Sequence, residues 1–379
     1  MRRLTPIALV LLALVGGCAR SSAVLRWERD RTAADELVAH RYELAGARRR
    51  QRLEAALARY RALIARAPDR ERKNQVLFAY GETLVRLTRR SEAIAWYRSI
   101  QRATRDDEVR AKARYRIAQI ALGQPSTRAD GERQMDALIL ALPNTTFGDL
   151  ALHHRIRRLR FEKRPLNQRL AYLMTMYDKL KPQRLSGRVL YWAARFCQAD
   201  PKRQRDAETY YRKLIENHTI HPLRKAAIFR LGKMLFDQHR DREAIATFLE
   251  LWGLREVAFL FGSYENVYYP EALFLVGEIY QRRLKNYRRA IAWYQKLRST
   301  YRVHALRDDS LYRIIECQVA LGEREAAIES FRLLRREGID YIRVSTRDKR
   351  TGLQKVFKWE SPFLKRAETL LERAGIRVR

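Results

Sequence analysis

The apolar and polar residues of Ile228–Leu251 are spaced as two short helices folded against each other. In the first segment, apolar or small residues recur three or four positions apart, which is the spacing of one helix face; they are Ile228, Leu231, Gly232 and Leu235. The second segment has the same spacing in Ala244, Phe248 and Leu251, after the wholly polar stretch 237–242. Gly232 and Ala244 have almost no side chain and mark the expected point of closest approach. A helical hairpin this short cannot bury its outer faces alone, so the pattern predicts further copies.

A small residue followed four positions later by an aromatic one recurs along most of the chain. The strong copies are Ala56…Tyr60, Ala93…Tyr97, Ala207…Tyr211, Ala244…Phe248, Ala290…Tyr294 and Ala327…Phe331, and the weaker ones are Gly131…Met135 and Leu170…Met174. The first members lie at 56, 93, 131, 170, 207, 244, 290 and 327, so the steps are 37, 38, 39, 37, 37, 46 and 37 residues. This near-constant spacing predicts an all-α solenoid of about eight stacked hairpins over residues 32–336. The alternative is an irregular helical bundle with coincidental pairs.

The repeats resemble the tetratricopeptide repeat, whose pattern is W-x2-L-G-x2-Y…A-x3-F…P with a period of about 34 residues. Its first-helix part is present in Leu77–Leu84 and Leu273–Tyr280 as well as in Ile228–Leu235. No copy opens with Trp, and the spacing is longer by roughly one helical turn. Long repeats of this kind are similar to those of bacterial envelope lipoproteins, such as the β-barrel assembly (competence) lipoprotein and the Tol–Pal-associated coordinator of cell division. The resemblance implies a superhelix whose first helices line a concave groove for partner proteins.

Residues 1–18 have the pattern of a lipoprotein signal peptide. Two arginines precede the apolar run Leu4–Val15, which is too short to span a bilayer as a stable helix, and Gly16-Gly17-Cys18 follows. This ending resembles a bacterial lipobox, in which Cys18 is acylated and becomes the new N-terminus; the alternative is a secretory signal that is cut elsewhere. By the same resemblance, Ala19 in place of Asp favours the outer membrane of a Gram-negative bacterium. Residues 19–31 are then expected to form a tether.

Two stretches depart from the repeat pattern. The 46-residue step contains nine more residues than the common 37, mostly in the apolar and aromatic stretch Gly253–Tyr269. This insertion either folds back over the solenoid or is an exposed contact for a partner. In residues 337–379, Asp340–Trp359 favours a β-hairpin, and Pro362–Ala374 has the pattern of an amphipathic helix that caps the end of the solenoid.

The formal net charge is +35, from 78 Lys and Arg against 43 Asp and Glu, and the excess is spread along the chain. It reflects solvated helix faces or else attracts an anionic surface. The most basic predicted helix contains Arg155, Arg157, Arg158 and Arg160. This helix either faces solvent with extended arginines or forms a phosphate-binding ridge. An envelope location argues against nucleic acid as a partner, apart from incoming DNA.

A column of aromatic residues is predicted along the groove. The residue after the opening apolar position of each first helix is rotated by about 100° toward the expected groove. An aromatic residue stands there in five repeats: Phe78, Trp192, Phe229, Phe274 and Tyr312. Charged residues follow on the same helices, among them Arg86, Lys233 and Arg282. These side chains either bind an extended peptide or amphipathic helix, or the aromatic ones wedge adjacent repeats together.

The sequence has no recognisable catalytic or metal-binding motif. It lacks a Gly-rich phosphate loop, H-E-x-x-H and G-x-S-x-G. His218 and His221 lie three residues apart, but no nearby carboxylate or Cys completes a set of metal ligands. Cys197 and Cys317 lie in first helices of distant repeats and are expected to be buried free thiols. We therefore expect neither an enzyme nor a bound cofactor.

Together these features predict a membrane-anchored scaffold of the bacterial cell envelope. It docks envelope proteins in its concave groove, faces the periplasm from the outer membrane, and takes part in assembling or coordinating an envelope machine. The alternative is a binder of an anionic polymer or lipid, such as peptidoglycan, lipopolysaccharide or DNA during uptake, through the arginine-rich faces.

Overall fold

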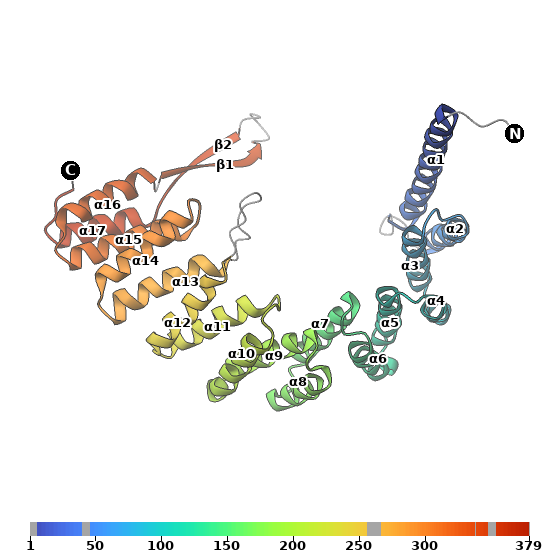
Figure 1. Cartoon of the computed structure of the whole chain (residues 1–379), viewed down its shortest axis with the longest axis horizontal. Coiled ribbons are helices and arrows are strands. Elements are labelled where there is room, and N and C mark those ends of the chain that lie inside the picture. The colour runs from blue at the N-terminus through green and yellow to red at the C-terminus, as the bar shows by residue number, and fades with distance from the viewer. Residues whose placement is uncertain (1–5, 40–45, 256–266, 338, 348–353, 379) are drawn as a thin grey trace. The chain divides into compact units, whose positions relative to one another are not determined.

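The computed structural model describes residues 6–39, 46–255, 267–337, 339–347 and 354–378. Within these ranges, helices follow one another through short connections and pair as successive hairpins (Figure 1). The predicted all-α fold of stacked helical hairpins is confirmed. The chain divides into two compact units, residues 1–186 and 187–379. That a single superhelix runs through all the repeats stays a prediction.

The first unit contains four hairpins. Their helices are α1 (Pro6–Ala39) with α2 (Gly46–Ala65), α3 (Arg70–Arg86) with α4 (Arg90–Ala103), α5 (Asp107–Leu122) with α6 (Arg128–Ala141), and α7 (Thr146–Phe161) with α8 (Leu166–Leu180). A short 3-10 helix, η1 (Pro125–Thr127), connects α5 to α6. Asp69 and Asp106 begin α3 and α5 by accepting hydrogen bonds from backbone N–H groups of the first turn, which have no partner within the helix.

The described residues of the second unit, together with residues 184–186 at the start of α9, form four further hairpins and a C-terminal segment. The hairpins are α9 (Arg184–Gln198) with α10 (Gln204–Asn217), α11 (Arg224–Asp237) with α12 (Asp241–Gly253), α13 (Tyr268–Glu278) with α14 (Tyr287–Thr300), and α15 (Leu306–Ala320) with α16 (Arg324–Glu337). The 3-10 helix η2 (Pro201–Arg203) precedes α10, and a π-helical turn, η3 (Ile279–Arg283), extends α13. The eight small-then-aromatic or weaker pairs therefore all fall in second helices, as predicted.

The anchor pairs form the core of each hairpin. In the six strong pairs every alanine is fully buried, and no aromatic partner is more than 5% exposed. Glycines of the first helices lie directly against these rings. A Cβ built on Gly81, Gly232 or Gly277 would come within 2.6, 2.7 and 2.6 Å of the ring of Tyr97, Phe248 and Tyr294, respectively. The close approach inferred for Gly232 is confirmed.

The first hairpin begins earlier than the sequence pattern placed it. Trp27 lies inside the predicted tether 19–31, yet it is only 4% exposed and its Nε1 donates a hydrogen bond to the backbone carbonyl of Leu63 at 3.1 Å. Ala34 and Val38 continue the same buried face of α1. The backbone of α1 runs without interruption from Pro6 to Ala39, so it includes residue 18 as well. The prediction of a tether is therefore wrong at least from Trp27 onward. The large apolar surface of the indole favours its burial in the core of the first hairpin.

The C-terminal segment contains a hairpin and a capping helix, as predicted. Strands β1 (Ile339–Arg347) and β2 (Gln354–Glu360) pair antiparallel, with Ile339 opposite Glu360 and an irregularity between Arg343 and Arg347. Helix α17 (Phe363–Arg373) packs on α15 and α16 and buries Ala367 and Leu371 completely. Residues 256–266 of the apolar insertion lie outside the described residues.

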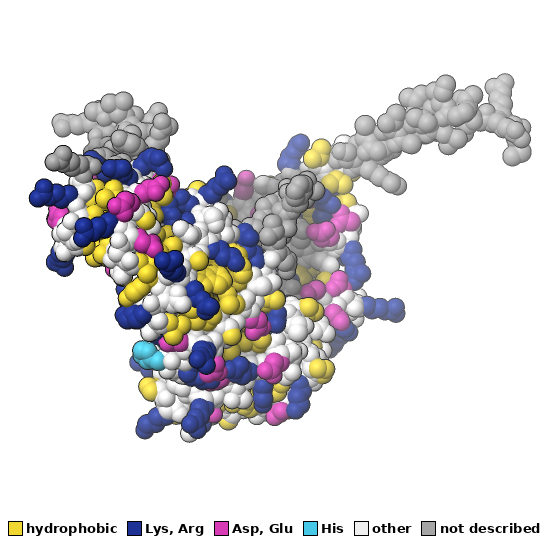
Figure 2. Space-filling model, turned by 60° about the vertical axis from the view of Figure 1, so that its left-hand side comes forward, with side chains coloured by type: hydrophobic (Ala, Val, Ile, Leu, Met, Phe, Trp, Pro, Cys, Tyr) yellow, Lys and Arg dark blue, Asp and Glu magenta, His cyan; other side chains and the backbone are white. Residues whose placement is uncertain are grey.

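Ion pairs between consecutive repeats account for part of the large arginine content. Each joins an arginine to a carboxylate in a neighbouring hairpin: Arg89 to Glu54 at 3.2 Å, Arg240 to Glu208 at 2.6 Å, and Arg283 to Asp241 at 2.6 Å. On the face shown in Figure 2, Lys and Arg side chains are scattered among Asp and Glu rather than gathered in one stripe. This distribution agrees with solvated helix faces more than with a single anionic-ligand surface.

Candidate functional site

Three of the five predicted groove aromatics are buried. Phe78, Phe229 and Phe274 are only 3%, 6% and 8% exposed. Their ring centroids lie 5.9, 6.1 and 5.4 Å from those of Tyr97, Phe248 and Tyr294, respectively. Phe229 also stacks on Tyr268 of the next repeat at 4.8 Å. These side chains hold helices and repeats together and leave almost no surface for a partner, so the groove prediction is wrong for them.

The fifth repeat shows why one aromatic was misplaced. Tyr191, not Trp192, is the counterpart of Phe78: it is 7% exposed and lies 6.3 Å from the anchor ring of Tyr211. Trp192 is half-buried beside Phe196, with ring centroids 6.0 Å apart. One residue of shift rotates a side chain by about 100° around a helix, so the sequence alone could not decide between two adjacent aromatics.

The remaining predicted groove residues are at least partly exposed. Tyr312 is half-buried and stacks on Phe363 of the capping helix at 5.5 Å. Lys233 lies 3.8 Å from Asp237, and Arg282 forms an ion pair with Glu278 at 3.0 Å. Arg86, on α3, has neither a hydrogen bond nor an ion pair within the part of the chain that the structure describes. Of the three predicted groove cations, Arg86 is the one that forms no ion pair with any described residue, so its charge is available to a ligand.

The arginines of α7 do not form a ridge. Arg155 is 5% exposed, and its guanidinium contacts Glu132 at 2.7 Å and Asp136 at 2.8 Å. Arg158 is half-buried between Glu132 and Glu162. The prediction that these two bind an anionic surface is corrected, because a buried arginine is tolerated when carboxylates surround it and then has no charge left to offer.

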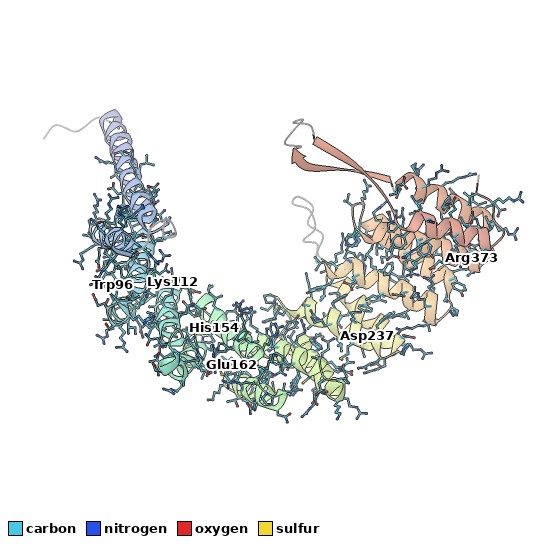
Figure 3. The ribbon with its side chains drawn as sticks, turned by 180° about the vertical axis from the view of Figure 1, so that it is seen from behind. Trp96, Lys112, His154, Glu162, Asp237 and Arg373 are labelled. Carbon is cyan, nitrogen blue, oxygen red and sulfur yellow. The ribbon has the colours of Figure 1, made fainter. Side chains whose placement is uncertain are left out.

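The other two arginines of that helix, Arg157 and Arg160, are exposed. His154 precedes them on the same helix (Figure 3), and burial lowers the pKa of its imidazole, with the nearby arginines acting in the same direction. The exposed part of α7 is therefore much smaller than the run of basic residues indicates.

A hollow of about 430 Å³ lies on the first-helix side of the first two repeats. It is lined from α1 by Asp35, Val38 and Ala39, from α2 by Tyr60, and from α3 by Ala79, Glu82, Thr83 and Arg86. The Tyr60 hydroxyl donates to the carboxylate of Asp35 at 2.6 Å. Burial, followed by this hydrogen bond, raises the pKa of Tyr60, so the phenol stays protonated.

A second hollow of about 240 Å³ adjoins the first and shares Glu82 and Arg86 with it. Its other lining residues are Val85 of α3, Tyr97 of α4, and Arg116, Gln119 and Ile120 of α5. Arg116 pairs with Glu82 across the two helices and donates to Oε1 of Gln119 at 2.9 Å. The two hollows together form a polar groove on α1, α3 and α5, which we call the N-terminal groove.

The sequence pattern had pointed to Arg86 but not to the rest of this groove. Asp35 lies in the predicted first hairpin, but no groove residue was predicted in its first helix, and α5 lacks the glycine found in α3, α11 and α13. Tyr97 was visible only as a core anchor. Tyr97 also lines the floor of the groove, because α4 lies beneath α3 and α5.

The described residues hold no group of three or more His, Cys, Asp or Glu side chains placed to bind a metal ion. Cys197 and Cys317 are buried and unpaired with each other, as expected. Among the same residues, no helix combines the length and the apolar character needed to cross a membrane.

Sequence comparison identifies the repeats. A tetratricopeptide-repeat family profile matches residues 46–108 and 203–255, and a second tetratricopeptide-repeat profile matches residues 271–302. The chain contains tetratricopeptide repeats. This repeat is typical of protein-binding scaffolds rather than of catalytic domains, and the matched ranges include α2–α4 of the N-terminal groove. The comparison with curated proteins found no match to the chain.

Solved structures with similar helical arrangements are distant. A human IFIT1 dimer with PPP-AAAA is 17% identical, with 74% of this chain and 63% of that chain covered and a TM-score of 0.36. The chain thus spans less than two thirds of the length of that protein. A tetratricopeptide repeat protein from Parabacteroides merdae (15% identity, 71% and 93% covered, TM-score 0.28) and yeast Tom70 (12% identity, 87% and 60% covered, TM-score 0.31) are also similar. At these TM-scores the similarities support no conclusion about partners or activity.

Proposed function

We propose that this protein is a scaffold that binds a segment of a partner protein in the N-terminal groove. The observation that carries the proposal is the pair of adjoining hollows on α1, α3 and α5, lined by charged and polar side chains of three consecutive repeats. A groove that extends over several repeats suits an extended segment, because each repeat contacts a different part of it. In contrast to the buried phenylalanines, Arg86 and Glu82 are accessible to such a segment.

We further propose that the scaffold is a lipoprotein of the bacterial outer membrane, held by acylation of Cys18. The support is the order of two arginines, a twelve-residue apolar run and Gly16-Gly17-Cys18 at the start of the sequence. Several acyl chains on one residue hold a protein on a membrane almost permanently, whereas one chain is marginal. Such an anchor would present the partner-binding repeats to other proteins of the envelope and suit a role in an envelope machine.

Partner capture tests the binding function. The tagged full-length chain is isolated from detergent-solubilised envelopes, and co-purifying proteins are identified by mass spectrometry. Arg86→Ala should remove the specific partner, whereas Arg102→Ala, which changes an exposed arginine of α4 outside the groove, should retain it. Equal recovery with both variants would show that the partner binds elsewhere.

Membrane attachment is tested separately with Cys18→Ser. The wild-type chain should incorporate labelled palmitate and fractionate with outer membranes, and the variant should do neither. A variant that stays with the outer membrane, or a wild-type chain without label, would contradict the anchor.

The alternative function is binding of an anionic polymer or lipid, which the net charge of +35 favours. Binding through phosphate contacts weakens steeply between about 50 and 200 mM salt, whereas binding of a peptide in a groove depends less on salt. Retention on lipopolysaccharide or DNA that survives the higher salt concentration would contradict binding of that ligand through phosphate contacts.

A further inference from the structure

The hydroxyl group of Tyr97 has no hydrogen-bond partner among the residues that the structure describes. Four anchor tyrosines are equivalent in the repeats, and three of them donate to a residue of their own hairpin: Tyr60 to Asp35 at 2.6 Å, Tyr211 to Gln198 at 2.8 Å, and Tyr294 to Gln281 at 2.9 Å. Tyr97 is 1% exposed, and its oxygen is buried without a partner in the described part of the chain. Buried polar groups are normally satisfied, so this exception needs an explanation.

The surroundings of Tyr97 contain more donors than acceptors. Tyr97 lines the hollow between α3 and α5 together with Arg86, Arg116 and Gln119. Arg116 uses one nitrogen on Glu82 and another on Gln119, but its Nε is also buried without a partner. Arg86 has no hydrogen bond or ion pair among the described residues. The hollow thus offers a hydroxyl and two guanidinium groups with unused donor capacity.

The local charge is positive as well. Lys112 of α5 (Figure 3) lies with its Nζ 4.2 Å from the ring centroid of Phe78 and is on the same helix as Arg116. Burial lowers the pKa of Lys112, and Glu82 partly opposes this shift. Arg86, Arg116 and Lys112 are therefore the cationic side chains near a single carboxylate, that of Glu82. An additional anion would be stabilised there.

We propose that the hollow between α3 and α5 binds a carboxylate side chain, Asp or Glu, of the partner segment. The carboxylate accepts hydrogen bonds from the half-buried Arg86 guanidinium and from the Tyr97 hydroxyl, whose oxygen is buried in the free chain and becomes accessible only when the side chains over it move apart. The adjoining hollow is lined by Asp35 together with Glu82 and Arg86, and the ligand carboxylate engages Arg86, so the neighbouring part of the segment is neutral or basic. The groove is acidic at α1 and basic at α5, and this polarity fixes the direction in which the segment lies. The inference rests on the proposed function of the N-terminal groove.

Matched peptides test the proposal. The probe is an array of N-acetylated, C-terminally amidated dodecapeptides with randomised flanks, made in pairs that differ only by Glu or Gln at one central position. The wild-type chain should prefer the Glu member by at least about tenfold, which corresponds to about 1.4 kcal/mol and is the low end of what a hydrogen bond to a charged group contributes. Tyr97→Phe should lower this preference several-fold and leave the melting temperature unchanged or higher, because the hydroxyl has no partner to lose.

Tyr211→Phe is the matched control, because Tyr211 lies outside the N-terminal groove. It removes a satisfied hydroxyl from the equivalent position, so it should lower the melting temperature but keep the preference for Glu. A wild-type chain that binds both peptides of each pair equally would overturn the carboxylate site and leave the scaffold function standing. Failure to bind any peptide would refute the scaffold function itself. Full preference in Tyr97→Phe, or a clear loss of stability in that variant, would show that the hydroxyl serves the core and not a ligand.

Discussion

Replacing Gly232 by alanine tests the packing on which each hairpin depends. The added Cβ would lie 2.7 Å from Cε1, 2.8 Å from Cδ1 and 3.1 Å from Cζ of Phe248. Ordinary contacts to a Cβ begin near 3.4 Å, so the ring or the helix must move by about 0.7 Å, the difference between 3.4 and 2.7 Å. The ring is 1% exposed and faces Phe229 at 6.1 Å, which leaves it little room to move.

Two opposing free-energy terms decide the outcome. Alanine is favoured over glycine in a helix interior by roughly 0.5–1 kcal/mol. Overpacking a closely packed core costs about 1–3 kcal/mol. We therefore expect Gly232→Ala to lower the free energy of unfolding by about 1–2 kcal/mol. Urea unfolding followed by far-UV circular dichroism measures this value, with an unchanged denaturant slope as the sign that the compactness of the unfolded state is the same.

Two further variants separate packing from helix propensity. Gly253→Ala adds a Cβ that meets nothing within 4 Å, so it should be neutral or slightly stabilising. Phe248→Leu in the Gly232→Ala background should recover part of the loss, because the smaller side chain makes room; the two changes should therefore couple favourably. If Gly232→Ala were as stable as the wild type, the close approach of α11 and α12 would not limit the core, and the reasoning from glycine position to repeat packing would fail.

Three other changes follow from the same structure. Trp27→Ala should destabilise the chain by about 3–5 kcal/mol in chemical unfolding, as for other buried aromatics, whereas a residue in a tether would have no effect. Burial raises the pKa of Cys197 to about 11 and that of Cys317 to about 12. In a Cys18→Ser background, these two thiols should react with a thiol reagent at pH 8 only after denaturant is added. Rapid labelling of the native chain would contradict their burial. The pKa of Glu208 lies below its usual 4.5, mainly through a hydrogen bond from its arginine partner in the next repeat. The ion pair of Glu208 with Arg240 therefore contributes its full stability above the usual pKa and loses it as the pH falls through the pKa of the folded state. Glu208→Gln should flatten the loss of stability below about pH 5. An unchanged pH profile would show that the ion pair contributes nothing.

The repeat architecture could be predicted from the sequence because contacts in a solenoid are local. Each hairpin packs on its neighbours, so the small-then-aromatic pairs at a spacing near 37 residues identify the second helices, and glycines such as Gly81 identify where the first helices approach them. The helical period then limits which positions face inward. The C-terminal hairpin and capping helix were visible for the same reason: a change of periodicity along the chain is a local signal.

The role of single side chains on those helices could not be predicted in the same way. Whether Tyr191 or Trp192 enters the core depends on the rotation of α9, and one residue changes it by about 100°. Arg155 is buried because Glu132 and Asp136 of the preceding hairpin receive it. A run of basic residues contains no information about carboxylates that are twenty residues away.

The sequence by itself determined that this chain forms paired helices in about eight repeats, because side-chain size and helical period act between residues close in the chain. Only the tertiary structure decided which polar groups converge. Glu82, Tyr97 and Arg116 come from three different helices, and they meet because α4 places the ring of Tyr97 beneath a glycine of α3. Hydrogen bonds and ion pairs require positions within a few tenths of an ångström, which are set by packing and not by residue type.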